Sequence, residues 1–191
     1  MTASPASSAT ARGLEALEEL RGVLEATDGA ALERFVDALA GARRVVAHGV
    51  GREGLMMRAL AMRLYHLGLD AHVLGDMTAP PVGESDLLVV SAGPGHFATV
   101  AALVDVARAA GARIACVTAT ADGDVPARAD TVLVLPAQTM RDDRGATRSV
   151  LPMGSLYEGA MYLAFELVVL RLGERTGTGA EAMRARHTNL E

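Results

Sequence analysis

Five short apolar segments constrain the fold of this chain more than any other feature of its sequence. They occupy residues 44–47, 71–74, 87–91, 114–118 and 131–135. Between them, apolar side chains recur every three or four residues over 55–67 and 99–110, which is the spacing of amphipathic helices. Apolar strands that alternate with helices form a parallel sheet covered on both faces. The sequence therefore predicts an α/β fold, a three-layer α-β-α sandwich around a five-stranded parallel sheet.

The rest of the chain fits around this sheet as a single domain. Its 191 residues, 50% of them hydrophobic, are enough for one domain with a sizeable core, and the chain is short for two domains. Further helices are predicted over 13–42, with a break at 27–29, and over 125–129, 154–171 and 179–186; a charged loop is predicted over 136–149. Residues 1–12 are small and polar. We expect them to form a disordered tail, followed by one domain over 13–191.

Charge and rare residue types argue against several kinds of partner. The net charge of -5 argues against nucleic acid, because a phosphate backbone binds a basic patch. The single cysteine, Cys116, excludes an internal disulfide, and its apolar neighbours predict a buried side chain. The five histidines lack metal-ligand spacing, so we expect no metal site. No apolar run approaches the ~20 residues of a membrane span, and the first residues lack a signal-peptide core. We therefore expect no membrane contact and a cytoplasmic protein.

A glycine-spaced turn joins the first apolar segment to the helix after it. Its glycines, Gly49, Gly51 and Gly54, have the spacing of a dinucleotide-binding fingerprint. Such a turn presents backbone N–H groups and a helix N-terminus to a polar or anionic ligand. The fingerprint also needs an acidic residue at a strand end about 20 residues further on. Only Asp70 and Asp76 lie near that position, and only Asp70 borders a strand, so dinucleotide binding is not favoured.

Three stretches of sequence carry a resemblance to a known family. They are the turn GVGREG with AMRLYHLG after it, SVLPMGSLYE at the start of the long helix, and the C-terminal RHTNLE. Together they resemble the sugar isomerase (SIS) domain and, within it, the 6-phospho-3-hexuloisomerases. The resemblance implies a flavodoxin-like fold, no cofactor, and a sugar, usually phosphorylated, bound at the C-terminal ends of the strands. It also implies a homo-oligomer, a tetramer built from dimers. The amphipathic N-terminal helices support this, because one small sheet cannot cover their apolar faces.

The loop after the third apolar segment differs from the family pattern. In the family, a Ser-Gly-Ser-Gly-x-Thr loop holds the phosphate at a helix N-terminus. Here Pro94 stands in place of a serine, Phe97 in place of the threonine and, in the first loop, Glu53 in place of a serine. Ser91 and Thr99 still offer hydroxyl groups nearby. Because a carboxylate repels phosphate, we expect this loop to bind phosphate poorly or in a new geometry.

The expected substrate-binding residues come from these two loops. They are Gly49, Gly51, Arg52, Glu53, Ser91, Gly93, Gly95, His96 and Thr99. Arg52 and His96 are candidate sources of positive charge, and each is alternatively an ordinary surface or loop residue. Glu53 is either a hydroxyl acceptor for an uncharged sugar or a solvent-exposed side chain. His48 and His66 are expected to be structural histidines.

Sugar isomerisation needs a base that moves a proton between adjacent carbons through an enediol, and a group that handles the hydroxyl proton. The candidate base is Glu158, in the first turn of the long helix; alternatively, it only complements the helix dipole. The candidate second group is His187, which resembles the family's C-terminal histidine that reaches a neighbouring subunit's site. Alternatively, it is a solvated tail residue.

The sequence thus predicts an aldose–ketose or ketose–ketose isomerase that resembles 6-phospho-3-hexuloisomerase and acts on a small sugar or sugar phosphate. The first alternative is an isomerase of an unphosphorylated or differently charged sugar. The second is a non-catalytic, sugar-sensing SIS module.

Overall fold

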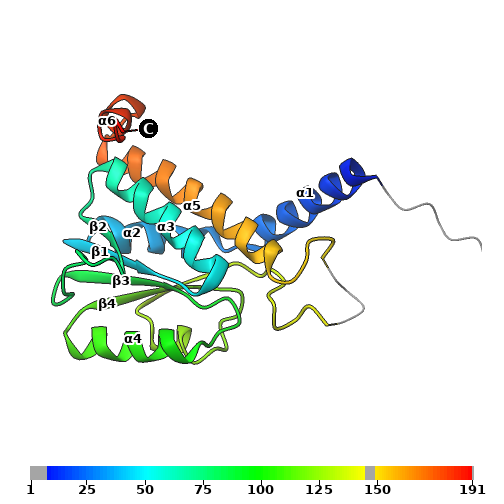
Figure 1. The fold of residues 1–191 in the computed structure, drawn as a ribbon, viewed down its shortest axis with the longest axis horizontal. Helices are drawn as coiled ribbons and strands as arrows, with labels where there is room; N and C mark the ends of the chain where they lie inside the picture. Colours follow the sequence, from blue (N-terminus) through cyan, green and yellow to red (C-terminus); the bar gives the residue numbers. More distant parts are fainter. Residues whose placement is uncertain (1–7, 145–148, 191) are drawn as a thin grey trace, which may run out of the picture.

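Each of the five apolar segments forms a strand of one parallel sheet (Figure 1). In chain order they are β1 (Arg44–His48), β2 (Ala71–Val73), β3 (Asp86–Ser91), β4 (Arg113–Thr118) and β5 (Thr131–Val134). The order across the sheet is β2-β1-β3-β4-β5. The computed structural model describes residues 8–144 and 149–190. The central strand β3 is buried along its whole length, as expected for an apolar strand covered on both faces.

Helices cover both faces of this sheet (Figure 1). On one face pack α2 (Gly29–Ala40), α3 (Gly51–Leu67) and α5 (Ser155–Thr176). On the other face lie α4 (Ala98–Ala109) and the 3-10 turn η1 (Pro126–Arg128). Two separate apolar clusters fill the spaces between the layers. The predicted three-layer α/β fold is confirmed.

Two helices lie outside these layers. The N-terminal helix α1 (Ala9–Ala26) packs against α5 and extends away from the rest of the molecule (Figure 1). The C-terminal helix α6 (Ala180–Ala185) packs against α3, and a hydrogen bond from Arg186 to the carbonyl oxygen of His66 ties the chain end there. The first and last described helices therefore pack against α5 and α3 rather than against the sheet.

The topology brings two turns together at one edge of the sheet. From β1 the chain crosses through α3 to β2 on one side, and from β3 it crosses through α4 to β4 on the other. The switch point lies between β1 and β3, whose C-terminal ends are paired at His48 and Val90. In open α/β sheets, ligands bind in the crevice at such a point. The fold thus places the glycine turn after β1 beside the turn after β3.

The helix boundaries differ from the prediction at the N-terminus. The helix α1 begins at Ala9, so residues 9–12, which were predicted as part of a disordered tail, form its first turn instead. The side chain of Ser8 accepts a hydrogen bond of 3.1 Å from the N–H of Ala11 and caps the helix. The prediction for residues 1–7 lies outside the described residues.

Two other helices are longer than predicted. The helix α3 begins at Gly51 rather than at residue 55, so most of the glycine turn is itself the first turn of the helix. The helix α5 continues to Thr176, where Gly177 adopts a left-handed conformation with a φ of 67° and ends it. The short helix predicted over 125–129 is the 3-10 turn η1.

Candidate active site

The turn between β1 and α3 depends on a direct contact between backbone atoms. A Cβ atom placed on Gly54 would lie 2.5 Å from the carbonyl oxygen of Gly49, and Gly51 has a φ of +58°. Residues other than glycine rarely fit either requirement. This tight turn places Arg52 and Glu53 in the first turn of α3, above the C-terminal end of the sheet.

Glu53 is buried, with 8% of its surface exposed, and the alternative of a solvent-exposed side chain is wrong. Its Oε2 accepts hydrogen bonds from the hydroxyl of Ser91, at 2.6 Å, and from the N–H of Gly93, at 3.0 Å. The hydroxyl of Tyr157 lies 3.2 Å from Ser91 Oγ, and it must donate there because the serine proton goes to Glu53. The pKa of Glu53 is raised: burial and the nearby charge of Glu158 raise it, whereas the hydrogen bonds from Ser91 and Gly93 lower it.

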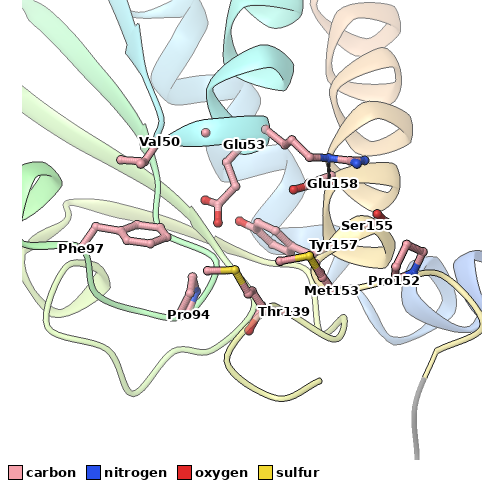
Figure 2. Close-up of a pocket in the computed structure, with 14 residues that line it drawn as sticks. Val50, Glu53, Pro94, Phe97, Thr139, Pro152, Met153, Ser155, Tyr157 and Glu158 are labelled. Carbon is pink, nitrogen blue, oxygen red and sulfur yellow. Dashed lines mark ion pairs between the residues drawn. The ribbon is translucent and has the colours of Figure 1, made fainter. Parts of the chain in front are cut away.

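A pocket of about 280 Å³ opens beside this carboxylate. Figure 2 shows the Glu53 carboxylate directed into it between the rings of Phe97 and Tyr157. Its walls come from the first turn of α3, the turn after β3, the loop after β5 and the first turn of α5. The lining residues are Val50, Gly51, Arg52, Glu53, Pro94, Phe97, Thr139, Met140, Pro152, Met153, Gly154, Ser155, Tyr157 and Glu158. Most of the lining is apolar, with polar groups at a few points, as is usual for small-molecule sites.

Glu158 lies in the first turn of α5 and belongs to this pocket. Its side chain is 13% exposed, and its Oε2 lies 2.5 Å from Nε of Arg52, an ion pair drawn in Figure 2. The pair joins the N-termini of α3 and α5 across the pocket and holds the carboxylate in one direction. The pocket therefore contains two carboxylates, Glu53 and Glu158, and one guanidinium group among its described residues.

The structure gathers some of the predicted binding residues and separates others. Gly51, Arg52 and Glu53 line the pocket with Glu158. Ser91 is buried behind Glu53, and Gly93 borders a neighbouring hollow of about 340 Å³. The remaining predicted residues, Gly49, Gly95, His96 and Thr99, do not line the pocket.

Three other histidines for which the sequence predicted a role lie on the surface, near a helix end and at a strand end. His96 is exposed, and its Nδ1 lies 3.1 Å from Oδ2 of Asp124. His66 is buried near the end of α3, and burial lowers the pKa of His48 at the end of β1. His96 thus pairs with an aspartate in the segment before η1 and does not line the pocket.

His187 lies at the opposite end of α3 from the pocket. Its ring centroid is 5.2 Å from that of His66, in the last turn of α3, whereas Glu53 is in the first turn. A helix of 17 residues is about 25 Å long. Within one chain, His187 therefore does not reach Glu158, so a role at this site requires a second subunit.

Sequence reasoning missed two contributions to the pocket. Tyr157 is 1% exposed, lines the pocket beside Glu158 and supports Ser91; the only signal was its position in the SLYE stretch. Glu19 of α1 accepts hydrogen bonds from the hydroxyl of Ser149 and from the N–H of Val150, the latter at 2.9 Å. It fixes the loop that leads to Pro152 and Met153 in the pocket wall, and nothing in the sequence indicated this.

The structure describes no metal centre and no reactive thiol at this site. The described residues contain no group of three or more His, Cys, Asp or Glu side chains arranged to hold a metal ion. Cys116 is buried in β4, as predicted, and burial raises the pKa of its thiol to about 12. None of the described helices has the length and apolar character needed to cross a membrane. The polar groups that face the pocket suit an organic ligand with hydroxyl groups.

Comparison with known proteins identifies relatives along most of the chain. No family model matches. The 3-hexulose-6-phosphate isomerase of Mycobacterium gastri is 40% identical over 148 residues, covering 78% of this chain and 74% of the relative. The protein of the same name in Bacillus subtilis is 29% identical over 177 residues, which cover 93% of this chain and 96% of the relative. A crystal structure from Methanococcus jannaschii, for which a molecular function of 3-hexulose-6-phosphate isomerase has been inferred, superposes with a TM-score of 0.78. It is 26% identical and covers 94% of this chain and 97% of the other.

These relatives confirm the resemblance found in the sequence and extend it beyond the three stretches that carried it. The likeness to the Mycobacterium gastri protein includes most of the domain. The superposition on the Methanococcus jannaschii structure includes 94% of this chain. The chain belongs to the 3-hexulose-6-phosphate isomerase family of SIS-domain proteins.

Proposed function

We propose that this protein is a ketose isomerase that moves the carbonyl group of a hexulose phosphate, or a closely similar sugar, between adjacent carbons. One observation carries the proposal: Glu158, a mostly buried carboxylate ion-paired with Arg52, lies in a sugar-sized pocket at the C-terminal edge of the sheet. The family supplies the reaction class, since its named members are isomerases of a sugar phosphate. The residues that touch the pocket supply the chemistry.

The reaction needs a base, and Glu158 is the base in this proposal. Its carboxylate takes the proton from the carbon next to the carbonyl group, the C–H electron pair forms the C=C bond of the enediol, and the carbonyl oxygen gains a proton. Glu158 then returns the proton to the neighbouring carbon, and the new carbonyl forms as the other hydroxyl loses its proton. Arg52 holds the carboxylate in place, and the apolar walls keep water from the enediol. No cofactor takes part.

A second subunit completes the site in this proposal. His187 handles the hydroxyl proton from a partner chain, because in its own chain it lies at the far end of α3. We propose a homotetramer built from dimers, working in the cytoplasm on a small sugar and without nucleic acid or membrane partners. Large apolar side chains exposed on helices support an assembly: Leu14, Leu17, Leu55, Met62, Tyr65, Tyr162 and Leu170. Light scattering should give about four times the monomer mass of 19.8 kDa.

The catalytic part of the proposal is tested by replacing Glu158 with Gln. The amide keeps the shape of the side chain and removes the base, so turnover of a ketohexose phosphate should fall by roughly 10²–10⁴ while the ligand still binds. The matched control is Glu84→Gln, an exposed glutamate just before β3, at the opposite edge of the sheet. An unchanged rate in Glu158→Gln would show that another group is the base.

The shared site is tested by mixing two inactive variants. After subunit exchange, random pairing of Glu158→Gln with His187→Ala chains should leave about one quarter of the sites with both intact groups. Activity should therefore return in the mixture and not in either variant alone. If the mixture stays inactive although exchange is shown by mass spectrometry, His187 does not act across a subunit boundary.

A further inference from the structure

We propose that Glu53 sets substrate specificity: it keeps phosphate out of the turn after β3 and accepts a hydrogen bond from a neutral sugar hydroxyl there. A phosphate group, where the substrate carries one, lies outside this turn. The inference rests on the proposed function for the identity of the ligand as a ketose. It concerns residues 92–95 and the side chain of Glu53, which comes from the neighbouring helix.

The first reason is that a carboxylate already uses the donors that would bind an anion. The N–H of Gly93 and the hydroxyl of Ser91 both donate to Oε2 of Glu53, at 3.0 and 2.6 Å. Hydrogen bonds to an ionised acceptor are stronger than those between neutral groups. An incoming phosphate would have to displace a buried side chain to reach either donor.

The second reason is that residues 92–95 offer no other free N–H group. The N–H of Ala92 donates to the carbonyl oxygen of Val117, and that of Gly95 donates to Ala92, at 3.0 and 2.8 Å. Pro94 has no N–H at all. Every backbone donor from residue 92 to residue 95 is therefore occupied or missing. The oxygen atoms of a phosphate placed here would find no free donor among these residues, which is costly for a buried charge.

The third reason is charge. Glu53 and Glu158 both belong to the pocket, and Arg52, the only cation among its described lining residues, is ion-paired with Glu158. Arg141 lies in the adjacent hollow, where its guanidinium donates to the carbonyl oxygen of Pro94 at 3.2 Å. A phosphate dianion beside Glu53 would therefore meet a like charge, and none of the described residues that line the pocket offers it a free cation.

The same geometry leaves a place for a hydroxyl group. Both hydrogen bonds to Glu53 end on Oε2, and Oε1 accepts none from the described residues. Figure 2 shows the carboxylate directed into the pocket, so a sugar hydroxyl can donate to it. The neighbouring rings of Phe97 and Tyr157 leave an apolar surface on either side, which suits the C–H face of a sugar better than a charged group.

The test measures binding, so it does not depend on turnover. Inorganic phosphate, fructose 6-phosphate and fructose are titrated calorimetrically into the wild type, Glu53→Ser, Glu53→Gln and the control Glu84→Ser, which removes the same charge far from the pocket. In Glu53→Ser the affinity for phosphate and for fructose 6-phosphate, relative to fructose, should rise about tenfold. Glu53→Gln should show a smaller rise, because it removes the charge and keeps the bulk. The Glu84→Ser variant should match the wild type.

Two outcomes separate this inference from the proposed function. If the ratio of affinities changes by less than threefold in both Glu53 variants, Glu53 does not exclude phosphate, whatever the wild type isomerises. If the ratio rises as expected but the wild type isomerises no ketose or ketose phosphate, the role of Glu53 stands and the proposed function fails. Should Glu53→Ser not fold, as judged by circular dichroism, Glu53→Gln alone decides the question.

Discussion

Replacing Gly54 with Ala is the most direct perturbation of the turn that carries the site. Alanine usually stabilises a helix relative to glycine by about 1 kcal/mol. Here, however, the new Cβ would lie 2.5 Å from the carbonyl oxygen of Gly49. Carbon and oxygen atoms in close contact normally stay about 3.3 Å apart, so one strand end or the helix must move by about 0.8 Å. We expect Gly54→Ala to lower the free energy of unfolding by about 1–3 kcal/mol, the usual cost of overpacking.

The control is the same substitution at Gly22, in the C-terminal half of α1. A Cβ placed there meets no atom within 4 Å, so Gly22→Ala should raise the free energy of unfolding by up to about 1 kcal/mol. Both variants are unfolded in urea at one fixed protein concentration, because the stability of the proposed tetramer depends on concentration. If the two variants differ by less than about 0.5 kcal/mol, the close contact between Gly49 and Gly54 does not constrain the turn.

Three further predictions concern ionisable side chains. The pKa of Glu53 is raised in the folded protein, chiefly by burial. The free energy of unfolding should therefore fall as the pH rises from the ordinary pKa of 4.5 through the raised pKa of the folded state. The Glu53→Gln variant lacks the titrating group, so its free energy of unfolding, measured in urea, should increase relative to the wild type over that pH interval. If the free energies of the two proteins change in parallel with pH, the reasoning is wrong. Replacing Glu19 with Ala removes the acceptor that holds the loop at Ser149. The value of kcat/KM should fall by up to about 10²-fold, and the free energy of unfolding should fall by about 1–2 kcal/mol. The control Glu18→Ala, at an exposed position, should change neither quantity. Cys116, with a thiol pKa raised to about 12, should react with iodoacetamide at pH 8 only after unfolding; rapid native labelling would show that β4 is accessible.

Most of the fold could be predicted because strand and helix signals were local. The five apolar segments alternated with amphipathic helices, and that pattern alone specifies a covered parallel sheet. The start of α3 was misplaced because the three glycines of the turn have poor helix propensity. The close contact between Gly49 and Gly54 holds them in place, and no spacing in the sequence reveals such a contact. The N-terminus of α1 was also misplaced, because residues 8–12 are small and polar and the cap at Ser8 was overlooked.

The site was predictable only in part, because its decisive contacts join distant positions. Arg52 and Glu158 were each singled out, and the parallel topology brings them together since both begin a helix at the C-terminal edge of the sheet. The burial of Glu53 could not be foreseen. A glutamate in the first turn of a helix is normally solvated, and its partners Ser91 and Gly93 lie 38 and 40 residues further along the chain. The direction of a side chain at a helix start depends on what the fold places opposite it.

The hydrogen bonds from Ser91 and Gly93 to Glu53 mean that the turn after β3 is organised before any ligand arrives. A loop that waits for an anion becomes ordered only on binding, and the lost conformational entropy weakens the complex. Here the ordering accompanies folding, because Glu53 of the same chain accepts the hydrogen bonds from Ser91 and Gly93. The turn therefore acts as a preorganised, rigid wall, and a sugar can enter the pocket without waiting for this segment to close.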